Sequence, residues 1–304
     1  MKQSVKSEAY AQQRMKSKQR MERIIHGVFL LLGLIAVGCV LLITLYLVIS
    51  GLPAMVEIGP VDFFLGQEWA PTAGEPSYGI LPFILSSVAG TAGAILLGVP
   101  IGFMTAVFLS KMAPSRLKDV MEGAVSLLAG IPSVVYGLVG MMVLLPAIRE
   151  TFHLAAGDSL LAAIIVLAVM ILPSIISVSE TALRAVPKEY EEASLALGAT
   201  ELETYFRVTA PAAKSGIAAA VVLGVGRAIG EAMAILMVAG NVANMPSLFA
   251  SVKFLTTAIA SEMSYAAVGS LQRNALYSIG LVLFLFIMCI NVFLNVFLKR
   301  DKEG

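Results

Sequence analysis

Two charged side chains, Arg227 and Glu231, stand four residues apart inside the apolar stretch GVGRAIGEAMAILMVAG, which begins at Gly224. A charge at the depth of a lipid bilayer costs free energy, so a charged pair there indicates a function such as ion passage. On a continuous helix the two residues would share one face with Gly224, and Gly226 and Gly230 lie close by, so that a neighbouring helix could approach. We therefore expect Arg227 and Glu231 to lie in the interior of a helix bundle.

An arginine in such a position suits the passage of an oxyanion. Its planar guanidinium stays charged at physiological pH and can donate two parallel hydrogen bonds to two oxygens of one anion. In this interpretation Arg227 lines the route, while Glu231 holds the guanidinium in place and prevents the resting pathway from trapping the anion. The alternative is an ion pair that only pins two helices together. Stability alone explains that alternative poorly, because Arg before Glu is the weaker order within one helix and a buried pair often gains little over apolar residues.

The element that would position this pair is one of several long apolar segments. The chain has 304 residues, of which 58% are hydrophobic and 13% charged, and its mean hydropathy is +0.89. This composition is typical of a membrane protein with several spans. Six segments are long enough for a helix to cross a bilayer: residues 24–50, 80–110, 120–146, 158–181, 215–241 and 275–298. We therefore predict an all-α membrane protein with six transmembrane helices.

Lysine and arginine side chains predict the orientation of these helices. With the N-terminus inside, 17 of them fall in inside segments, and three fall in outside loops, namely Arg149, Lys253 and Arg273. Because loops rich in Lys and Arg stay in the cytoplasm, both termini are predicted to be cytoplasmic. The predicted organisation is a basic tail over residues 1–23 that contacts lipid headgroups, one transmembrane domain over 24–298, and a second tail over 299–304. In the first outside loop, Trp69 is expected to be an interfacial belt residue.

Motifs for catalysis and nucleotide binding are absent from the sequence. No G-x-x-x-x-G-K-[ST] pattern occurs, and no Ser/His/Asp or Cys/His constellation can be assembled. The two cysteines, Cys39 and Cys289, lie in apolar segments and predict neither a disulfide nor a metal site. The formal net charge of +1 gives no indication of a nucleic-acid partner. We expect a chain without a metal or cofactor of its own that does not hydrolyse nucleotide itself.

The longest predicted cytoplasmic loop, residues 187–211, has the pattern of two short helices. Pro187 precedes a stretch of acidic residues and helix formers that continues to Gly198, a residue type that commonly ends helices. Thr200 and Glu203 have the spacing of a capping box, in which each side chain bonds the other residue's backbone N–H, and this predicts a second helix. A structured loop between two transmembrane helices is suited to docking on a cytoplasmic protein.

This loop resembles the EAA loop of ABC-importer permeases, whose pattern is E-A-A, three residues, G, nine residues and I-x-L-P. Four positions match the pattern outright: Glu192, Ala193, Gly198 and Pro211. Three positions carry conservative departures from it: Ser194, Val208 and Ala210. The resemblance implies a coupling helix that sits in a cleft of an ATPase subunit and a turn at the glycine.

Three further stretches narrow the resemblance. They are EWAPTAGEPSYGILPF from Glu68, LLAGIPSVVYGL from Leu127 and GVGRAIGEAMAILMVAGN from Gly224. They are similar to the permeases of phosphate-specific (Pst) ABC importers, and to the PstC-type subunit in particular, over most of residues 60–298. The resemblance implies the MetI-like fold of these permeases and a bacterial inner-membrane location. It also implies a second related permease, an ATPase dimer that binds ATP, an extracytoplasmic phosphate-binding protein, and phosphate itself.

Three other functions stay open on the sequence. A permease of the same class could carry another oxyanion such as molybdate or sulfate, because the resemblance assigns recognition of the phosphate proton to the separate binding protein. A secondary transporter or channel would need no ATPase, and the loop of residues 187–211 argues against it. A membrane anchor or sensor would transport nothing and would have no use for Arg227 and Glu231.

Overall fold

The computed structural model describes the backbone of residues 2–300 and the side chains of residues 21–292. Contacts divide the chain into two units, Met1–Ser50 and Gly51–Gly304. In chain order the elements are α1 (Lys2–Ile58), α2 (Pro60–Leu65), β1 (Trp69–Ala70), β2 (Ser77–Tyr78), α3 (Leu81–Val107), the π-helical η1 (Phe108–Met112), α4 (Ser115–Gly130), α5 (Ser133–Val139), the π-helical η2 (Gly140–Leu144), α6 (Leu145–Thr151), α7 (Leu160–Arg184), α8 (Lys188–Ala196), α9 (Glu201–Thr204), the π-helical η3 (Tyr205–Thr209), α10 (Ala210–Ala212), α11 (Lys214–Gly230), α12 (Met233–Val238), α13 (Leu255–Glu262) and α14 (Leu271–Arg300).

The described residues contain five helices that are long and apolar enough to cross a membrane: Met21–Ile58, Leu81–Met112, Ser133–Thr151, Leu160–Arg184 and Leu271–Val292. A sixth span results if the helical pieces Glu201–Ala212 and Lys214–Gly230, which meet at 73°, are counted together. Each of the six predicted segments overlaps one of these spans. The prediction of an all-α membrane protein with six transmembrane helices is therefore confirmed.

The first unit consists of helix α1 up to Ser50. From Met21 onward its side chains are mostly apolar and exposed, and Phe29, for example, is 69% exposed. Exposed apolar side chains over this length of helix are what a lipid bilayer covers. The predicted boundary between a tail and a span near residue 23 lies within this helix and stays a prediction. The last four residues of the predicted tail 299–304 lie outside the described residues.

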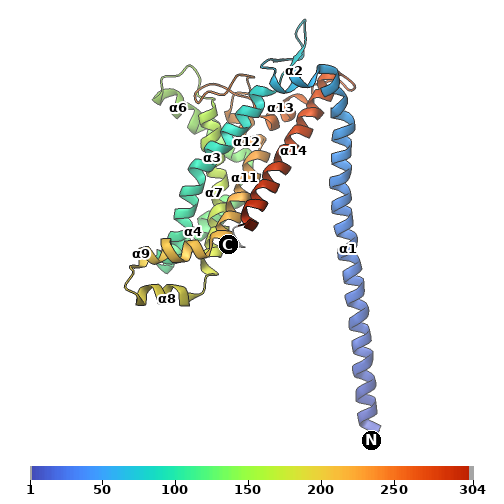
Figure 1. Ribbon diagram of the computed structural model, residues 1–304, viewed down its shortest axis with the longest axis vertical. Coiled ribbons are helices and arrows are strands. Elements are labelled where there is room, and N and C mark those ends of the chain that lie inside the picture. The colour runs from blue at the N-terminus through green and yellow to red at the C-terminus, as the bar shows by residue number, and fades with distance from the viewer. Residues whose placement is uncertain (1, 301–304) are drawn as a thin grey trace. The chain divides into compact units, whose positions relative to one another are not determined.

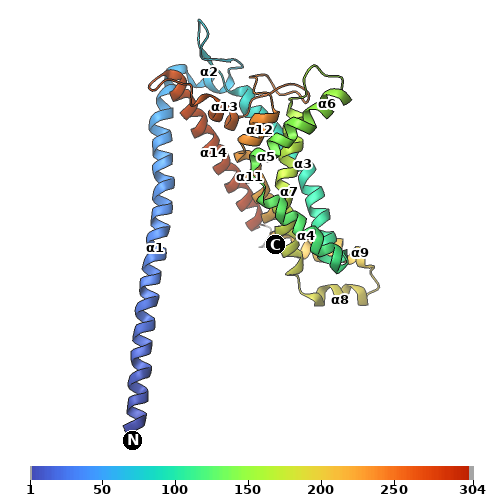
Figure 2. The ribbon, with the colours of Figure 1, turned by 180° about the vertical axis from the view of Figure 1, so that it is seen from behind.

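Helices α3, α7 and α11 pack together as the core of the second unit (Figures 1 and 2). Two glycines of α3 allow this close approach. A Cβ atom added at Gly98 would lie 2.9 Å from Cδ1 of Ile171, and one added at Gly102 would lie 2.8 Å from Cγ2 of Ile175. Lipid is as apolar as a leucine side chain, so close packing of small residues has to supply much of the attraction between membrane helices.

Two predicted segments are broken helices, which corrects the sequence prediction. The segment 120–146 is interrupted between α4 and α5, where Pro132 precedes the second piece. The segment 215–241 is interrupted after Gly230, and Glu231 has an extended backbone with ψ 131°. At this second break the Thr256 hydroxyl donates a hydrogen bond of 2.7 Å to the Glu231 carbonyl. A contact from another part of the chain thus replaces the backbone bond that a continuous helix would supply.

The hairpin formed by β1 and β2 corrects the expectation for Trp69. Its indole is only 8% exposed and lies against the Phe83 ring, so it is not a belt residue at the lipid interface. The indole Nε1 donates to the Glu262 carboxylate at 2.9 and 3.1 Å. The same carboxylate accepts from Lys253 at 2.5 Å and from Gln272 at 3.3 Å. Glu262 therefore fastens the hairpin to α13 and α14.

Candidate functional site

Arg227 lies in the last turn of α11, where the partial negative charge of the helix end favours a cation. The side chain is half-buried, and its Nη1 donates a hydrogen bond to the Ser174 hydroxyl of α7 at 3.4 Å. Arg227 and Ser174 line a cavity of about 600 Å³ that also reaches Asn291 of α14. Three helices that are distant in sequence thus bring one cation, one hydroxyl and one amide to a single cavity.

Arg227 and Glu231 do not form a pair in the structure, and the expectation that they share one helix face is wrong. Helix α11 ends at Gly230, which turns Glu231 away from the register of the preceding helix. The Glu231 carboxylate instead accepts a hydrogen bond of 3.0 Å from the backbone N–H of Ala234 in the first turn of α12. No ion pair joins the two residues in the part of the chain whose side chains the structure describes. Glu231 therefore caps a helix start rather than holding the guanidinium.

The cavity beside Arg227 has a positive and otherwise weakly polar lining. Its remaining described lining residues are Ala219, Val222, Leu223 and Gly226, and no described carboxylate lines it. A guanidinium that is partly removed from water and has no described counter-ion attracts an anion, because apolar walls reduce screening. The unpaired Arg227 also leaves guanidinium N–H groups available for a ligand.

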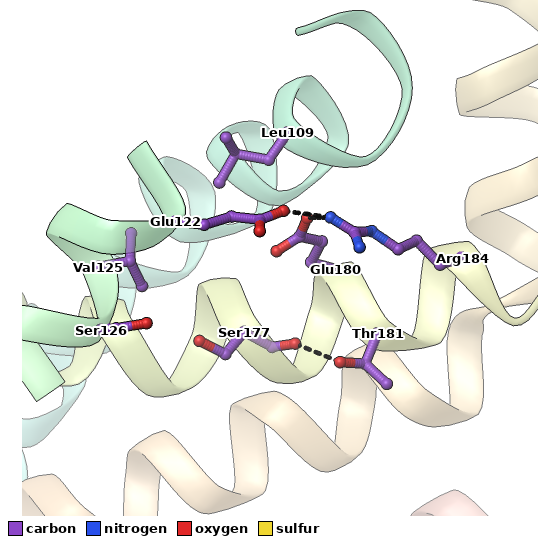
Figure 3. A pocket seen from close by; sticks show the side chains of 8 residues that line it. All are labelled: Leu109, Glu122, Val125, Ser126, Ser177, Glu180, Thr181 and Arg184. Carbon is purple, nitrogen blue, oxygen red and sulfur yellow. Dashed lines mark hydrogen bonds and ion pairs between the residues drawn. The ribbon is translucent and has the colours of Figure 1, made fainter. Parts of the chain in front are cut away.

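A second arginine, Arg184, lies in a cavity of about 340 Å³ but is already neutralised (Figure 3). Its Nη2 contacts the carboxylates of both Glu122 and Glu180, which face it from α4 and α7. Desolvation opposes the ionisation of Glu122, yet the hydrogen bond from Arg184 and the nearby positive charges lower the pKa of this carboxyl. Because two carboxylates surround one guanidinium, the net charge at Arg184 is not positive and this cavity does not attract an anion. Of these two cavities, the one at Arg227 is the candidate anion site.

The loop of residues 187–211 has the predicted local structure. Helix α8 follows Pro187, and Gly198 has φ +90°, a backbone conformation that favours glycine. Helix α9 begins after Thr200 with both bonds of the predicted capping box, 3.3 Å from the Glu203 N–H to the Thr200 hydroxyl and 3.0 Å from the Thr200 N–H to the Glu203 carboxylate. The prediction of a helix, a glycine turn and a second helix is confirmed.

Helix α8 presents its surface away from the bundle, at the end of the second unit opposite α2, α6 and α13 (Figures 1 and 2). It has no buried residue. Four residues matched to the EAA pattern are exposed: Glu192, Ala193, Gly198 and Pro211. Large apolar side chains beside them are exposed too, with Tyr190 at 54% and Leu197 at 91%. An exposed apolar surface on a loop outside the spans is typical of a site for another protein.

Three residues of these sites were not identified from the sequence. Ser174 and Asn291 are polar residues inside apolar segments, and that contrast is a signal that could have found them. Glu191, beside the matched Glu192, bonds to Lys111 and to Thr209. The sequence offers no signal that Glu191 rather than Glu192 makes these contacts, because both carboxylates lie in the same acidic stretch. Only the packing of η1 and η3 distinguishes them.

Within residues 21–292, no three His, Cys, Asp or Glu side chains gather as metal ligands would. Cys39 and Cys289 are both free and exposed.

Known proteins similar to this chain share its class. Residues 98–301 match the family described as "Binding-protein-dependent transport system inner membrane component". The probable ABC transporter permease protein YqgH of Bacillus subtilis (strain 168) is 44% identical over 265 residues, which cover 85% of this chain and 86% of that protein. The phosphate transport system permease protein PstC of Mesorhizobium japonicum is 36% identical over 259 residues, covering 79% and 78%. The protein of the same name from Pasteurella multocida is 32% identical over 265 residues, covering 80% and 82%.

Solved structures share the fold at low sequence identity. A permease chain of a bacterial alginate ABC transporter, in complex with an alginate-bound periplasmic protein, is similar with a TM-score of 0.63 and 17% identity, covering 92% of this chain and 96% of that one. A chain of the inward-facing MetNI methionine ABC transporter gives a TM-score of 0.58 and 20% identity, covering 73% and 95%. The arrangement of spans is thus that of the MetI-like permeases. Together with the sequence similarity, this means that the chain belongs to the family of binding-protein-dependent transport system inner membrane components, and it is a permease subunit of an ABC importer.

Proposed function

We propose that this permease subunit imports inorganic phosphate and passes it through the cavity at Arg227. The observation that carries the proposal is a half-buried arginine in an apolar helix that lines a cavity of about 600 Å³ and pairs with no described carboxylate. An unpaired guanidinium at such a position is costly unless it serves an anion. The similarity to permeases named PstC supports phosphate as that anion.

In this proposal the Arg227 guanidinium donates two parallel hydrogen bonds to oxygens of the passing anion. Ser174 holds one guanidinium nitrogen at 3.4 Å and so limits the rotation of the side chain. One positive charge and few further donors make the site weak, and a weak site is what passage requires, because an anion that binds too tightly does not leave. The phosphate proton is recognised in the extracytoplasmic binding protein.

Glu231 has a supporting role in the pathway. Its carboxylate caps the start of α12, and its carbonyl accepts from Thr256, so it fixes the break that follows α11. The carboxylate still lies close to Arg227 in sequence, and it limits how strongly the region attracts an anion. Replacement by Gln would keep a cap acceptor but remove this charge.

The energy for transport comes from a partner ATPase dimer, which binds the ATP. The surface that docks in the ATPase cleft consists of Glu192, Ala193 and Gly198, with Pro211 at the end of the loop. ATP-driven closure of the ATPases moves this loop, and alternating access opens the cavity to the outside. A second, related permease completes the pathway, and membrane lipid covers the exposed apolar side chains.

The proposed orientation places both termini and Arg207 in the cytoplasm and the β1–β2 hairpin outside, following the distribution of Lys and Arg. In a chain whose two cysteines have been replaced, a cysteine at Arg207 should react with an impermeant thiol reagent only after the membrane is opened. A cysteine at Glu75, which is exposed in the hairpin, should react in intact cells. Reaction of the position 207 variant from outside would contradict the orientation.

The choice of phosphate is tested by disrupting the encoding gene and measuring uptake of radiolabelled phosphate, sulfate and molybdate in cells. Phosphate uptake at low concentration should fall and return when the intact gene is restored, while uptake of the other two anions stays unchanged. Selective loss of sulfate or molybdate uptake would instead assign the permease to that oxyanion.

A further inference from the structure

Lys111 and Glu191 form an ion pair between two distant parts of the chain. Lys111 lies in η1, the π-helical continuation of α3 at the end of the span Leu81–Met112. Glu191 lies in α8, the helix of the docking loop. The two side chains are only 13% and 18% exposed, so the pair is better shielded than an ordinary surface ion pair.

The position of α8 depends on polar contacts, because this helix buries no side chain. Besides the Lys111 contact, the Thr209 hydroxyl donates to the Glu191 carboxylate at 3.0 Å. The hydroxyls of Ser194 and Thr204 are 2.9 Å apart. Thr204 and Thr209 are fully buried and belong to the same loop as α8. Among these described contacts, the one to Lys111 connects α8 with the span Leu81–Met112, whereas Thr204 and Thr209 belong to the helical pieces that continue into α11.

The helix that Lys111 extends, α3, is one of the three helices that pack together in the second unit. Helix α3 packs along α7 through Gly98 and Gly102, and it also contacts α11, which carries Arg227. A displacement of Lys111 along the membrane normal would therefore be imposed on the helices that surround the cavity, because tightly packed helices shift as rigid bodies.

We propose that the Lys111–Glu191 ion pair is the link through which a displacement of α8 reaches α3 and the helices of the cavity. The inference rests on the proposed docking of α8 on an ATPase subunit. Glu191 and Lys111 are positioning residues in this view, and neither touches ATP or the transported anion. Glu192, one residue further on, is exposed and faces the partner, so two adjacent carboxylates divide the tasks of docking and transmission.

The test uses the full complex of both permeases, the ATPase dimer and the binding protein in proteoliposomes. Lys111→Met and Glu191→Gln each remove one charge, and the double variant Lys111→Glu with Glu191→Lys exchanges them. In each single variant the ATPase should stay bound, while the amount of anion transported per ATP hydrolysed falls about tenfold, within the usual range of coupling between sites. The exchanged pair should recover most of this loss, as a direct interaction requires.

Matched controls are Arg116→Met and Asp119→Asn, which remove one positive and one negative charge at exposed positions of α4, outside the docking loop. They should keep the ratio of transport to hydrolysis. Normal ratios in both single variants would overturn the proposal, and so would a charge exchange that recovers nothing.

The proposed substrate is tested separately with the wild-type complex. If this complex does not transport phosphate, the result contradicts the choice of phosphate but not the role of the ion pair. The ion pair is then assessed with whichever of phosphate, sulfate or molybdate the wild type carries. Stimulation of ATP hydrolysis by the loaded binding protein is a second readout, because it passes between the same sites in the opposite direction. It should fall in both single variants, and retained stimulation would contradict the link.

Discussion

Replacement of Arg227 by Gln is expected to abolish phosphate uptake in a complex that assembles at near-normal abundance. Gln keeps hydrogen-bonding capacity, but it removes the positive charge that faces the cavity beside Ser174. Loss of a fixed charge that interacts with an anion in a poorly screened site should lower uptake by about a hundredfold or more. The measurement is uptake of radiolabelled phosphate, compared at equal amounts of purified complex.

Two further variants distinguish a pathway role from packing. Arg227→Lys keeps the charge but loses the planar pair of donors, so partial uptake is expected. Arg227→Met fills similar space without charge, and if Arg227 only packs against Ser174, this variant should transport normally. Arg149→Gln removes an exposed arginine of α6 and serves as the control that should retain uptake. Full activity of Arg227→Met would contradict the proposed pathway.

Replacement of Gly198 by Val is expected to give a complex that inserts in the membrane but does not couple ATP hydrolysis to transport. Gly198 has φ +90°, and a branched side chain in the left-handed region costs about 1–2 kcal/mol or more. No atom lies within 4 Å of a Cβ added there, so the cost is in the backbone and not in a steric clash. The turn between α8 and α9 should change shape, and the docking surface should lose its fit. Co-purification of the ATPase and phosphate uptake measure this effect.

The graded control at this position is Gly198→Asn, because Asn enters the left-handed region more readily than Val. It should retain more ATPase binding and more uptake than Gly198→Val, at the same membrane abundance. Equal and normal uptake in both variants would remove this turn from the coupling mechanism.

Local signals explain why the helix–turn–helix structure of residues 187–211 was predicted well. The proline before α8, the positive φ at Gly198 and the capping box of Thr200 and Glu203 all depend on residues a few positions apart. Such features are readable in one sequence because the physical interactions act between near neighbours. The six apolar segments were predicted for a similar reason, since bilayer thickness fixes the length of each span.

The features that could not be predicted from the sequence depend on contacts between residues far apart in the chain. The break after Gly230 depends on Thr256 and on close packing of α12 against α5, where a Cβ added at Gly137 would lie 2.9 Å from Cα of Ala234. The Arg227 side chain was assigned to an anion from its type and depth, but its contact with Ser174 joins two different helices. Trp69 was assigned to the lipid interface from its loop, whereas Glu262, 193 residues later, draws the indole inside.

ATP-driven phosphate import is tested most directly by accumulation of radiolabelled phosphate in proteoliposomes that contain this chain, its partner permease and the ATPase dimer. Phosphate should accumulate only when ATP is present on the ATPase side and the loaded binding protein on the other, and an excess of sulfate or molybdate should not compete. Accumulation driven by an ion gradient without the ATPase would contradict the proposal, as would accumulation of sulfate or molybdate in place of phosphate.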